Sequence, residues 1–370
     1  LEADGRLEMC SKPRTSLHDL AHEFRFYNHE ITEVSKIFGI AHLGIGVEPF
    51  HKSDEVSFCP KARYSILKKF YKNSSALCDW LKIVNGIHVN FDYTSEQDAI
   101  RKSQLMWRAS SILAAMFAFS PIQNNKPAEY LDTRLTITNK FDSSRTNLHK
   151  EFLRKDFSFK KWLDFCLDQK IFYIMREGKP IYPKKTFREF IEKGVAAAGD
   201  CPRIFPTIRD FNLHLKSIWL EIRIRKYIEF RAIDSVPPFL VMAGPALVKG
   251  LLYSEESMAA VEKLIGDLSF EELMQLREDV IKENLQAPLR KKKVLDYAKE
   301  LLTIASDNLK SFKNLNEKGE DESVYLEPLK EFVLIKEKSP ARYVLEKWQG
   351  EWDKSPAKLI EWCTAETRPA

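Results

Sequence analysis

The sequence predicts a protein that mixes β-strands with α-helices, a pattern compatible with the α+β class. Strands are predicted where apolar residues alternate with polar ones, most clearly in the segment YIEFRAID at residues 227–234. Helices are predicted where apolar residues recur three and four positions apart, as in residues 16–38. From Pro238 onward the pattern is mainly helical. We therefore expect a single domain, with a sheet-based core in residues 1–237 and a helical part in residues 238–370.

The composition is that of an ordinary globular protein. The chain has 370 residues, of which 44% are hydrophobic and 30% charged, which is enough to form a large core. A net charge of +5 is mild for this length, so no nucleic-acid partner is expected. No apolar run approaches the roughly 20 residues that span a bilayer. No signal peptide is visible either, so no membrane contact is expected.

The six cysteines are scattered, without the paired spacing that zinc sites require. Free thiols in a reducing compartment are therefore expected, which favours a cytoplasmic location. The glycines do not form the motif G-x-x-x-x-G-K-[ST], so any nucleotide site in this chain is not a P-loop.

Charged residues dominate one face of the strand predicted in YIEFRAID. The residues expected on that face are Tyr227, Glu229, Arg231 and Ile233. Glu229 and Arg231 lie about 7 Å apart along it, at about 3.3 Å per residue. Just upstream, Glu221, Arg223 and Arg225 alternate with isoleucines in the same way. Carboxylates can hold a divalent cation and arginines can bind phosphate or carboxylate, but salt bridges on a solvated sheet face explain the pattern equally well.

Two strand-like stretches flank the first predicted helix. An Asp-Gly pair at residues 4–5 favours a turn, and a short strand follows it. Gly39 provides the end of the helix predicted over residues 16–38. Residues 40–49 are then predicted to form a strand.

Two later segments bring polar side chains to predicted helix starts or strand faces. PKARY at residues 60–64 opens a helix, and Arg63 near its start either meets an anion or belongs to a solvated turn. The alternating segment 86–92 predicts a strand with His88 and Asn90 on one face.

A long helix and a long loop are expected next. TSEQ at residues 94–97 forms a capping box for an apolar helix that continues to about Phe119. The polar stretch 120–146 is predicted to be irregular, and its Arg134 and Arg145 suit the binding of carboxylates. The remaining predicted elements are a helix at 158–167, a strand at 171–176 and helices that begin near 269 and 294.

The segment HLKSIWLEIRIRKYIEFRAID at residues 214–234 resembles a long signature of the glutamate–cysteine ligases of the plant and proteobacterial type. The matching residues are His214, Leu215, Glu221, Arg223, Tyr227, Glu229, Arg231 and Asp234. The departures, at Leu220, Phe230 and Ala232, remove no charged group. Segments such as LEADGRLEM near the start and PARYVLEKWQGEW near the end resemble the same family, so the resemblance covers nearly the whole chain.

This resemblance implies an α+β fold in which a curved antiparallel sheet carries the active site and helices wrap it, as in the glutamine-synthetase-like ligases. It implies that the γ-carboxylate of L-glutamate is joined to the amine of L-cysteine through γ-glutamyl phosphate, the first step of glutathione biosynthesis. The implied ligands are L-glutamate, L-cysteine, ATP and Mg²⁺, and a monomer or weak homodimer is expected. Three alternatives stay open: a related carboxylate–amine ligase that uses another amine, a non-catalytic homologue, and a nucleic-acid binder.

The resemblance also implies roles for individual residues. The implied metal ligands are Glu2, Glu8, Glu229 and His88, although plant-type relatives tend to carry glutamine at the position of His88. Arg231 and Glu229 are implied to be catalytic, with Arg231 acting on the transferring phosphate. The implied substrate-binding residues are Arg134, Arg145, Arg63 and Asn90, and the further signature residues are Glu221, Arg223 and His214.

The chain departs from the family at three places. Thr138 stands where the family has tryptophan, which changes the expected shape of the substrate pocket. Tyr182 stands where the plant family has a redox-regulatory cysteine, so no regulatory disulfide with Cys201 is expected. The first active-site strand of the family has no counterpart in the sequence, and we expect it to lie before Leu1.

Overall fold

The computed structural model describes residues 1–72, 74–196 and 203–367, and Cys201 lies outside these residues. The described chain is mostly helical with small antiparallel sheets, which confirms the α+β class. The curvature expected for the sheet stays a prediction. No helix in the described residues is both long and apolar enough to cross a membrane.

In chain order, the first part contains α1 Leu17–Phe38, α2 Ala62–Phe70, α3 Ser75–Lys82, β1 Gly86–Phe91 and α4 Glu96–Phe117. The middle contains β2 Ile122–Gln123, β3 Lys126–Pro127, α5 Thr133–Phe141, α6 Ser143–Thr146, α7 Phe159–Asp168, β4 Ile174–Arg176, β5 Lys179–Ile181, α8 Phe187–Lys193, α9 Ile208–Leu215, β6 Ile222–Ile224 and β7 Ile228–Asp234. The last part contains α10 Pro238–Val241, α11 Ala243–Leu252, α12 Glu255–Ile265, α13 Phe270–Glu283, β8 Pro288–Leu289, β9 Lys292–Lys293, α14 Val294–Ser311, α15 Glu327–Lys330, α16 Pro340–Gln349 and α17 Pro356–Thr364.

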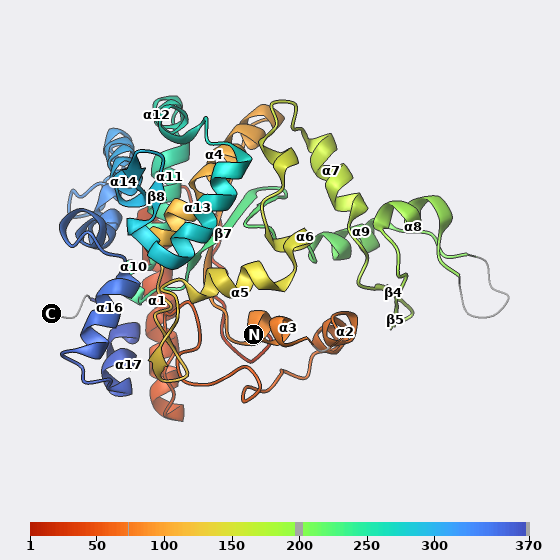
Figure 1. Ribbon diagram of the computed structural model, residues 1–370, viewed down its shortest axis with the longest axis horizontal. Helices are drawn as coiled ribbons and strands as arrows, with labels where there is room; N and C mark the ends of the chain where they lie inside the picture. Colours follow the sequence, from red (N-terminus) through yellow and green to blue (C-terminus); the bar gives the residue numbers. More distant parts are fainter. Residues whose placement is uncertain (73, 197–202, 368–370) are drawn as a thin grey trace.

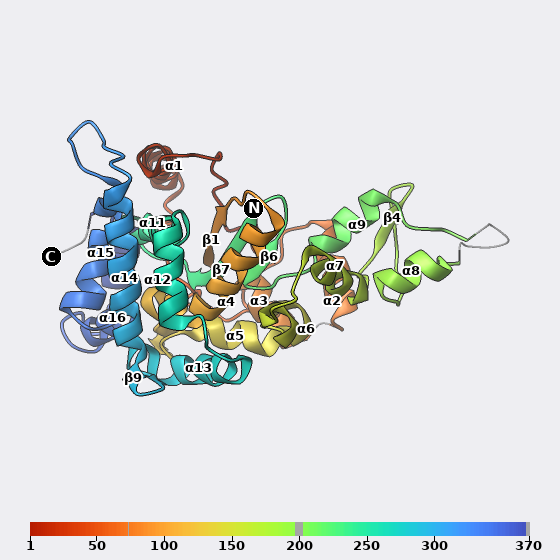
Figure 2. The same cartoon turned by 90° about the horizontal axis from the view of Figure 1, so that it is seen from above.

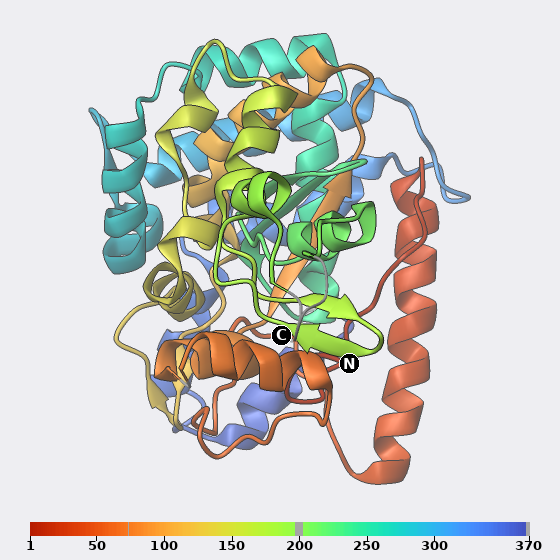
Figure 3. The ribbon, with the colours of Figure 1, turned by 90° about the vertical axis from the view of Figure 1, so that its right-hand side faces the viewer.

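The sheet that contains β7 lies near the middle of the molecule, between two groups of helices. Figure 1 shows the helices of the last part gathered at one end, and α7, α8 and α9 extending as an arm at the other. Figures 2 and 3 show α1 standing along one side of the molecule, apart from the other helices. The arrangement leaves the edge formed by β1 on the same side as α1.

The predicted helices are confirmed, and two of the predicted strands are wrong. Helix α1 begins after Ser16, whose side chain accepts a hydrogen bond from the backbone N–H of His18, and ends at Gly39, which has a left-handed φ of 63°. Residues 1–9 and 40–49 form no strand; Val47 makes only an isolated bridge with Val84. The stretch 120–146, predicted to be irregular, contains α5, α6 and the short β2–β3 hairpin.

The central sheet has three antiparallel strands in the order β1-β7-β6. Its register places Asn90 of β1 opposite Glu229 of β7, and Glu229 opposite Arg223 of β6. Residues that are directly opposite in an antiparallel pair point to the same face. The register therefore brings an amide, a carboxylate and a guanidinium into one row across the sheet.

A β-bulge interrupts the alternation of β7. Val89 pairs with Phe230 and Ile87 pairs with Ile233, so Arg231 and Ala232 together lie opposite the single residue His88. After the bulge the side chains change faces. The side chain of Ile233 packs against Gly244 of α11, beside those of Val89 and Ile87. The prediction that Ile233 shares a face with Glu229 and Arg231 is therefore wrong.

Helices cover the apolar face of the sheet. Helix α4 packs against β6 and β7, and α11 packs against β1. The middle and end of α4 are buried almost without interruption, and Phe117, Phe119 and Phe230 are among the fully buried side chains. Because this face is sealed by the core, the charged face of the sheet is directed away from it, toward the space beside α1.

Candidate active site

A cavity of about 1490 Å³ lies over the charged face of the sheet. Its walls include residues of the segment 2–14, of α1 and of the aromatic region around α3. The predicted site residues that line it are Glu2, Glu8, Arg63, His88, Asn90, Arg134, His214, Glu221, Arg223, Glu229 and Arg231. Arg145 is not among the described residues that line it. The fold therefore brings residues from both ends of the 1–237 segment to one cavity.

Glu229 is the centre of an arginine cluster on the floor of this cavity. Its Oε2 accepts a hydrogen bond from Nε of Arg223 at 2.9 Å, and its Oε1 accepts one from Nη1 of Arg231. Nη1 of Arg225 lies 3.9 Å from Oε2. Burial by itself would raise the pKa of Glu229, but the charges and hydrogen bonds of Arg231 and Arg223 hold that pKa below its ordinary value. Glu229 is therefore ionised and surrounded by positive charge.

His88 lies between this cluster and the N-terminal segment. Its Nδ1 is 3.7 Å from Oε1 of Glu229 and 3.7 Å from Oε1 of Glu8, and 3.4 Å from Nη1 of Arg231. Burial and then the charge of Arg231 lower the pKa of His88 well below its ordinary value. The imidazole is therefore neutral, which is the form that binds a metal ion or accepts a proton.

Glu8 and Glu2 form a second group of carboxylates at the rim. Burial raises the pKa of Glu8, and a hydrogen bond with Glu2 and the negative charge of Glu2 raise it further. Oε2 of Glu2 lies 3.6 Å from Nη2 of Arg63. A cation between these two carboxylates would relieve their repulsion, which the arginines do at Glu229.

Glu2, Glu8 and His88 bring donor atoms of the kinds that bind divalent cations to the rim side of the cavity. Within residues 1–72, 74–196 and 203–367, no three His, Cys, Asp or Glu side chains are placed so that they hold one metal ion together. Glu2 and Glu8 offer oxygen atoms, which Mg²⁺ prefers, and His88 offers a neutral nitrogen. Glu229 faces the same space, but both of its oxygens already accept hydrogen bonds from arginines.

Arg6 fixes the segment that carries Glu2 and Glu8. Its guanidinium donates to the carbonyl of Leu81 at 2.7 Å and to Oδ1 of Asn85 at 2.6 Å, immediately before β1. It also donates to Oδ1 of Asp4 at 2.6 Å. This residue was not among the predicted site residues. Its only local signal is an arginine placed directly after the Asp-Gly turn, between the two predicted metal ligands.

Two predicted carboxylate-binding arginines donate to backbone carbonyls. Arg134 borders the cavity, and its Nη1 and Nη2 donate to the carbonyls of Ala232 and Arg231 at 2.9 and 2.6 Å. Arg145 is buried, donates to the carbonyls of Ser217 and Lys170, and lies over the ring of Phe172. Arg145 therefore stabilises the backbone behind the cavity wall and, within the described part of the chain, does not itself line the cavity.

The remaining signature residues are held by buried partners. Glu221 forms an ion pair of 2.6 Å with Arg277 of α13. The Nε2 of His214 is 2.8 Å from the carbonyl of Cys166, and burial lowers the pKa of His214 to about 4. These contacts attach the residues that precede β6 to the helices α13 and α7.

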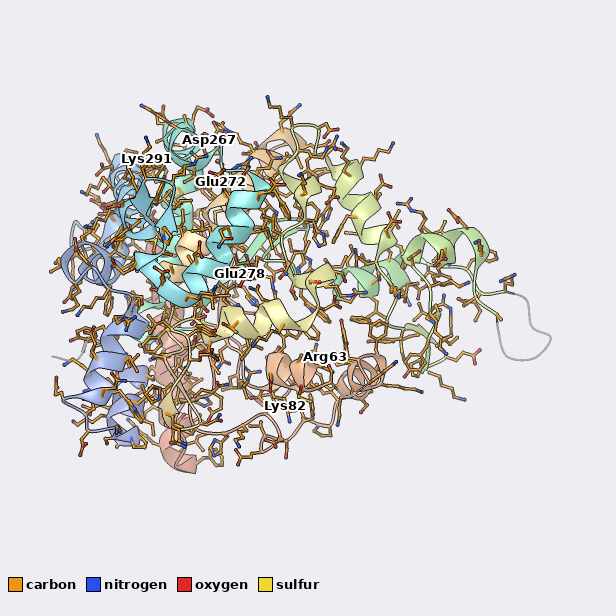
Figure 4. All side chains as sticks on the ribbon, in the orientation of Figure 1. Arg63, Lys82, Asp267, Glu272, Glu278 and Lys291 are labelled. Carbon is orange, nitrogen blue, oxygen red and sulfur yellow. The ribbon has the colours of Figure 1, made fainter. Side chains whose placement is uncertain are left out.

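Arg63 and Asn90 are the accessible predicted substrate contacts. The side chain of Arg63 is 53% exposed, and its Nη2 donates to the hydroxyl of Tyr64 at 2.7 Å. Figure 4 shows Arg63 and Lys82 in the region of α2 and α3, apart from Asp267 and Glu272. Asn90 is exposed at the end of β1, opposite Glu229. Both residues retain room to meet a ligand.

Aromatic side chains form another wall of the cavity. The rings of Trp80 and Trp219 have centroids 4.8 Å apart, and those of Phe172 and Trp219 are 5.5 Å apart. Thr138 lines the same cavity, and its hydroxyl donates to the carbonyl of Arg134 at 2.9 Å. This aromatic wall could not be recognised in the sequence, because Trp80, Phe172 and Trp219 come from three separate segments.

Comparisons with known proteins agree with the resemblance found in the sequence. Residues 1–360 match the model of the family described as glutamate-cysteine ligase family 2. The chloroplastic glutamate–cysteine ligase of Medicago truncatula is 32% identical over 360 residues, which cover 96% of this chain and 68% of that protein. The chloroplastic glutamate–cysteine ligase B of Oryza sativa subsp. japonica is 30% identical over 357 residues, covering 96% of this chain and 70% of that protein. The chloroplastic enzyme of Arabidopsis thaliana is 30% identical over 366 residues, or 98% of this chain and 68% of that protein.

Proposed function

The chain belongs to glutamate-cysteine ligase family 2, and from that premise we propose that it joins the γ-carboxylate of L-glutamate to the amine of L-cysteine. ATP is split to ADP and phosphate in this reaction. The single observation that best supports the proposal is the arrangement around Glu229. Three arginines and one neutral histidine surround one buried carboxylate on the floor of a large cavity, and two further carboxylates, Glu8 and Glu2, lie beyond the histidine.

The chemistry requires two displacements. An oxygen of the γ-carboxylate attacks the γ-phosphorus of ATP, the bond from that phosphorus to the bridging oxygen breaks, and ADP leaves with both bonding electrons. The amine nitrogen of cysteine then attacks the acyl carbon of γ-glutamyl phosphate. Phosphate leaves, the nitrogen loses a proton, and the amide remains. Both steps bring anions together, so catalysis consists mainly of positioning and charge compensation.

Arg231 is suited to the transferring phosphoryl group. It lies in the bulge of β7, its side chain is 16% exposed, and its Nη1 contacts Glu229 and His88. A guanidinium has five N–H donors, so Arg231 can hold Glu229 and still donate to phosphate oxygens. Glu229 in this account keeps Arg231 and Arg223 in place and faces the cation site with its Oε1.

Magnesium would be held at the rim of the cavity by Glu2, Glu8 and His88, with Glu229 behind them, once these side chains come closer together than in the described structure. When bound, it would compensate the charge of the phosphate oxygens. The side chains of this chain also act without it, since the arginines on the charged face of the sheet can orient the phosphate.

Arg63 and Asn90 are the proposed contacts for substrate carboxylate and amine groups, because both are accessible at the cavity. The proposed binding of substrate by Arg134 and Arg145 stays a prediction, as do the cytoplasmic location and the monomeric or weakly dimeric state. For Arg134, the contacts described above support a second role, developed below.

A related ligase with another acceptor amine is the second candidate. The observation that favours it is Thr138, a small side chain on a cavity wall otherwise formed by Trp80, Trp219 and Phe172. A small residue beside this aromatic wall leaves room for an amine larger than cysteine.

Both candidates are tested by one set of rate measurements. The release of ADP from ATP is measured with L-glutamate and Mg²⁺, and with L-cysteine, L-alanine, L-phenylalanine or no amine. The first proposal expects turnover to require an amine and kcat/KM to be highest with cysteine. A higher kcat/KM with phenylalanine would favour the second candidate, and the absence of turnover with every amine would refute both.

A further inference from the structure

The backbone of the bulge in β7 is held by one side chain. Arg231 and Ala232 occupy the extra position of the bulge, and their carbonyls accept hydrogen bonds of 2.6 and 2.9 Å from Nη2 and Nη1 of Arg134. Arg134 is 8% exposed and Ala232 is 2% exposed, so the bond to Ala232 is buried and the bond to Arg231 is partly buried. A buried carbonyl that leaves the ladder of a sheet needs another donor. Arg134 supplies that donor to both residues of the bulge.

Gly86 makes room for this guanidinium. A Cβ atom at residue 86 would lie 2.5 Å from Nη2, 2.9 Å from Cζ and 3.0 Å from Nε of Arg134, which is closer than real contacts allow. Gly86 begins β1 and is paired with Asp234 at the end of β7. The guanidinium therefore lies directly against the backbone of β1 while it binds the backbone of β7.

Asp234, the last residue of β7, lies on another side of the same guanidinium. Oδ1 of Asp234 lies 3.8 Å from Nη1 of Arg134. The other oxygen of Asp234 accepts hydrogen bonds from the backbone N–H of Phe119 at 2.8 Å and from the hydroxyl of Ser120 at 2.9 Å. Nε of Arg134 finds no hydrogen-bond partner among the described residues. The guanidinium is thus confined by β1 and β7, and the segment that links α4 to α5 holds Asp234 in place.

The bulge determines where Arg231 points. Arg231, the first residue of the bulge, shares the cavity face with Glu229, and after the bulge Ile233 returns to the core face. Bulges redirect side chains and are common beside active sites. Without Arg134, the carbonyls of Arg231 and Ala232 would lose their hydrogen-bond donor. The backbone of Arg231 would then be free to change its torsion angles, and the guanidinium of Arg231 would move relative to Glu229 and His88.

We propose that Arg134, seated against Gly86, is a positioning residue: it holds the bulge of β7 and thereby the direction of Arg231 in the cavity. The inference rests on the proposed function only for its effect on catalysis. A misplacement of about 1 Å of a catalytic group can reduce a rate about 100-fold, so the consequence falls on kcat. In this role both Nη groups of Arg134 donate to backbone carbonyls rather than to a substrate carboxylate.

The test compares Gly86→Ala, Arg134→Lys and the double variant with the unchanged protein. Gly86→Ala removes no polar group and adds one methyl, which would meet the guanidinium of Arg134 and displace it. Arg134→Lys keeps the charge but can serve only one carbonyl well. Matched controls are Gly350→Ala, whose added Cβ meets only the carbonyl of Glu346 at 3.3 Å, and Arg176→Lys, which removes a guanidinium that binds Asp210 and two carbonyls on the arm.

Both single variants should lower kcat by about 10- to 100-fold and change KM for glutamate and ATP by less than about threefold. The kcat of the double variant should lie within about twofold of the kcat of the slower single variant, because both changes disrupt the same contact between Arg134 and the bulge. A rise in the KM of glutamate with unchanged kcat in Arg134→Lys would overturn the proposal, since that is the effect of losing a substrate contact. Fully additive losses would overturn it as well.

Hydrogen exchange provides a readout that does not depend on activity. Amides of residues 86–91 and 228–234 should exchange at least about tenfold faster in both variants than in the unchanged protein, and the two controls should match the unchanged protein there. If no ligase activity is found at all, faster exchange in these strands still supports the device and the failure belongs to the proposed function. Unchanged exchange in both strands overturns the inference. Arg134→Lys keeps the test valid if Gly86→Ala does not fold.

Discussion

Replacing Glu229 by glutamine is predicted to destabilise the protein as well as to inactivate it. The carboxylate accepts hydrogen bonds from Arg223 and Arg231, and Arg225 lies 3.9 Å away. Glutamine keeps the shape but has no charge, and it offers an oxygen to only one of the two bonded arginines. Its NH₂ group would then face the N–H donors of the other arginine.

The expected size of the effect follows from burial. The side chains of Glu229 and Arg223 are 7% and 9% exposed, whereas that of Arg231 is 16% exposed. Removing one partner of a buried ion pair costs about 3–5 kcal/mol. Because Arg231 and Arg225 retain some solvent, we expect the lower end, about 3 kcal/mol of unfolding free energy at pH 7. Loss of a charge-compensating group should also reduce kcat by about 100-fold or more.

Glu8→Gln is the matched control, because Glu8 is also a predicted metal ligand in the same cavity. Burial and the neighbouring Glu2 raise the pKa of Glu8, so its ionised form is disfavoured in the folded protein. Glutamine there should leave the stability unchanged or slightly increase it, while activity still falls. The two carboxylates are thus expected to differ in their effect on stability and to agree in their effect on activity.

Urea unfolding followed by tryptophan fluorescence measures the stabilities, and ADP release at saturating Mg²⁺ measures the activities. The account requires a lower urea midpoint for Glu229→Gln than for Glu8→Gln. Equal urea midpoints for Glu229→Gln and the unchanged protein would show that the contacts of Glu229 with the arginines do not stabilise the fold. Near-normal turnover of Glu229→Gln would refute its place in the active site.

Three further predictions concern single residues. Arg231→Lys should lower kcat about 100-fold with little change in KM, because lysine cannot fork onto two phosphate oxygens; a change confined to KM would contradict its proposed role. Burial raises the pKa of Asp234 to about 6, so the folded protein takes up a proton there before the unfolded chain does as the pH falls. The free energy of unfolding of the unchanged protein should therefore rise, relative to that of Asp234→Asn, between pH 7 and pH 5. The opposite trend would contradict that pKa. Dithiothreitol should change activity little, because Tyr182 stands where the resemblance implies the regulatory cysteine of the plant family, so no regulatory disulfide is expected. A reversible loss of activity on oxidation, mapped to Cys201, would contradict this.

The strand β7 could be predicted from the sequence because its alternation is a local property. The bulge at Arg231 and Ala232 could not, because it depends on how β7 pairs with His88 of β1. For the same reason Ile233 was assigned to the wrong face. Residues 40–49 have a strand-like composition but find no partner strand, apart from the single bridge at Val47.

Spacing could not distinguish Arg134 from Arg145, since both are arginines in one polar stretch. The structure separates them through contacts far along the chain, to Ala232 for one and to Ser217 for the other. Glu2 and Glu8 reach the cavity only because Arg6 attaches their segment to the residues before β1. The resemblance to a family identified these glutamates, whereas residue spacing alone did not.

The central claim is that this cavity joins glutamate to cysteine at the expense of ATP. The most direct measurement is the mass of the product formed from L-glutamate, L-cysteine, ATP and Mg²⁺, with ADP quantified in the same sample. The account predicts γ-glutamylcysteine and ADP in equal amounts, neither of them formed by Glu229→Gln at more than about a hundredth of the rate of the unchanged protein. ADP formed without the dipeptide, or the dipeptide formed equally well by Glu229→Gln, would contradict it.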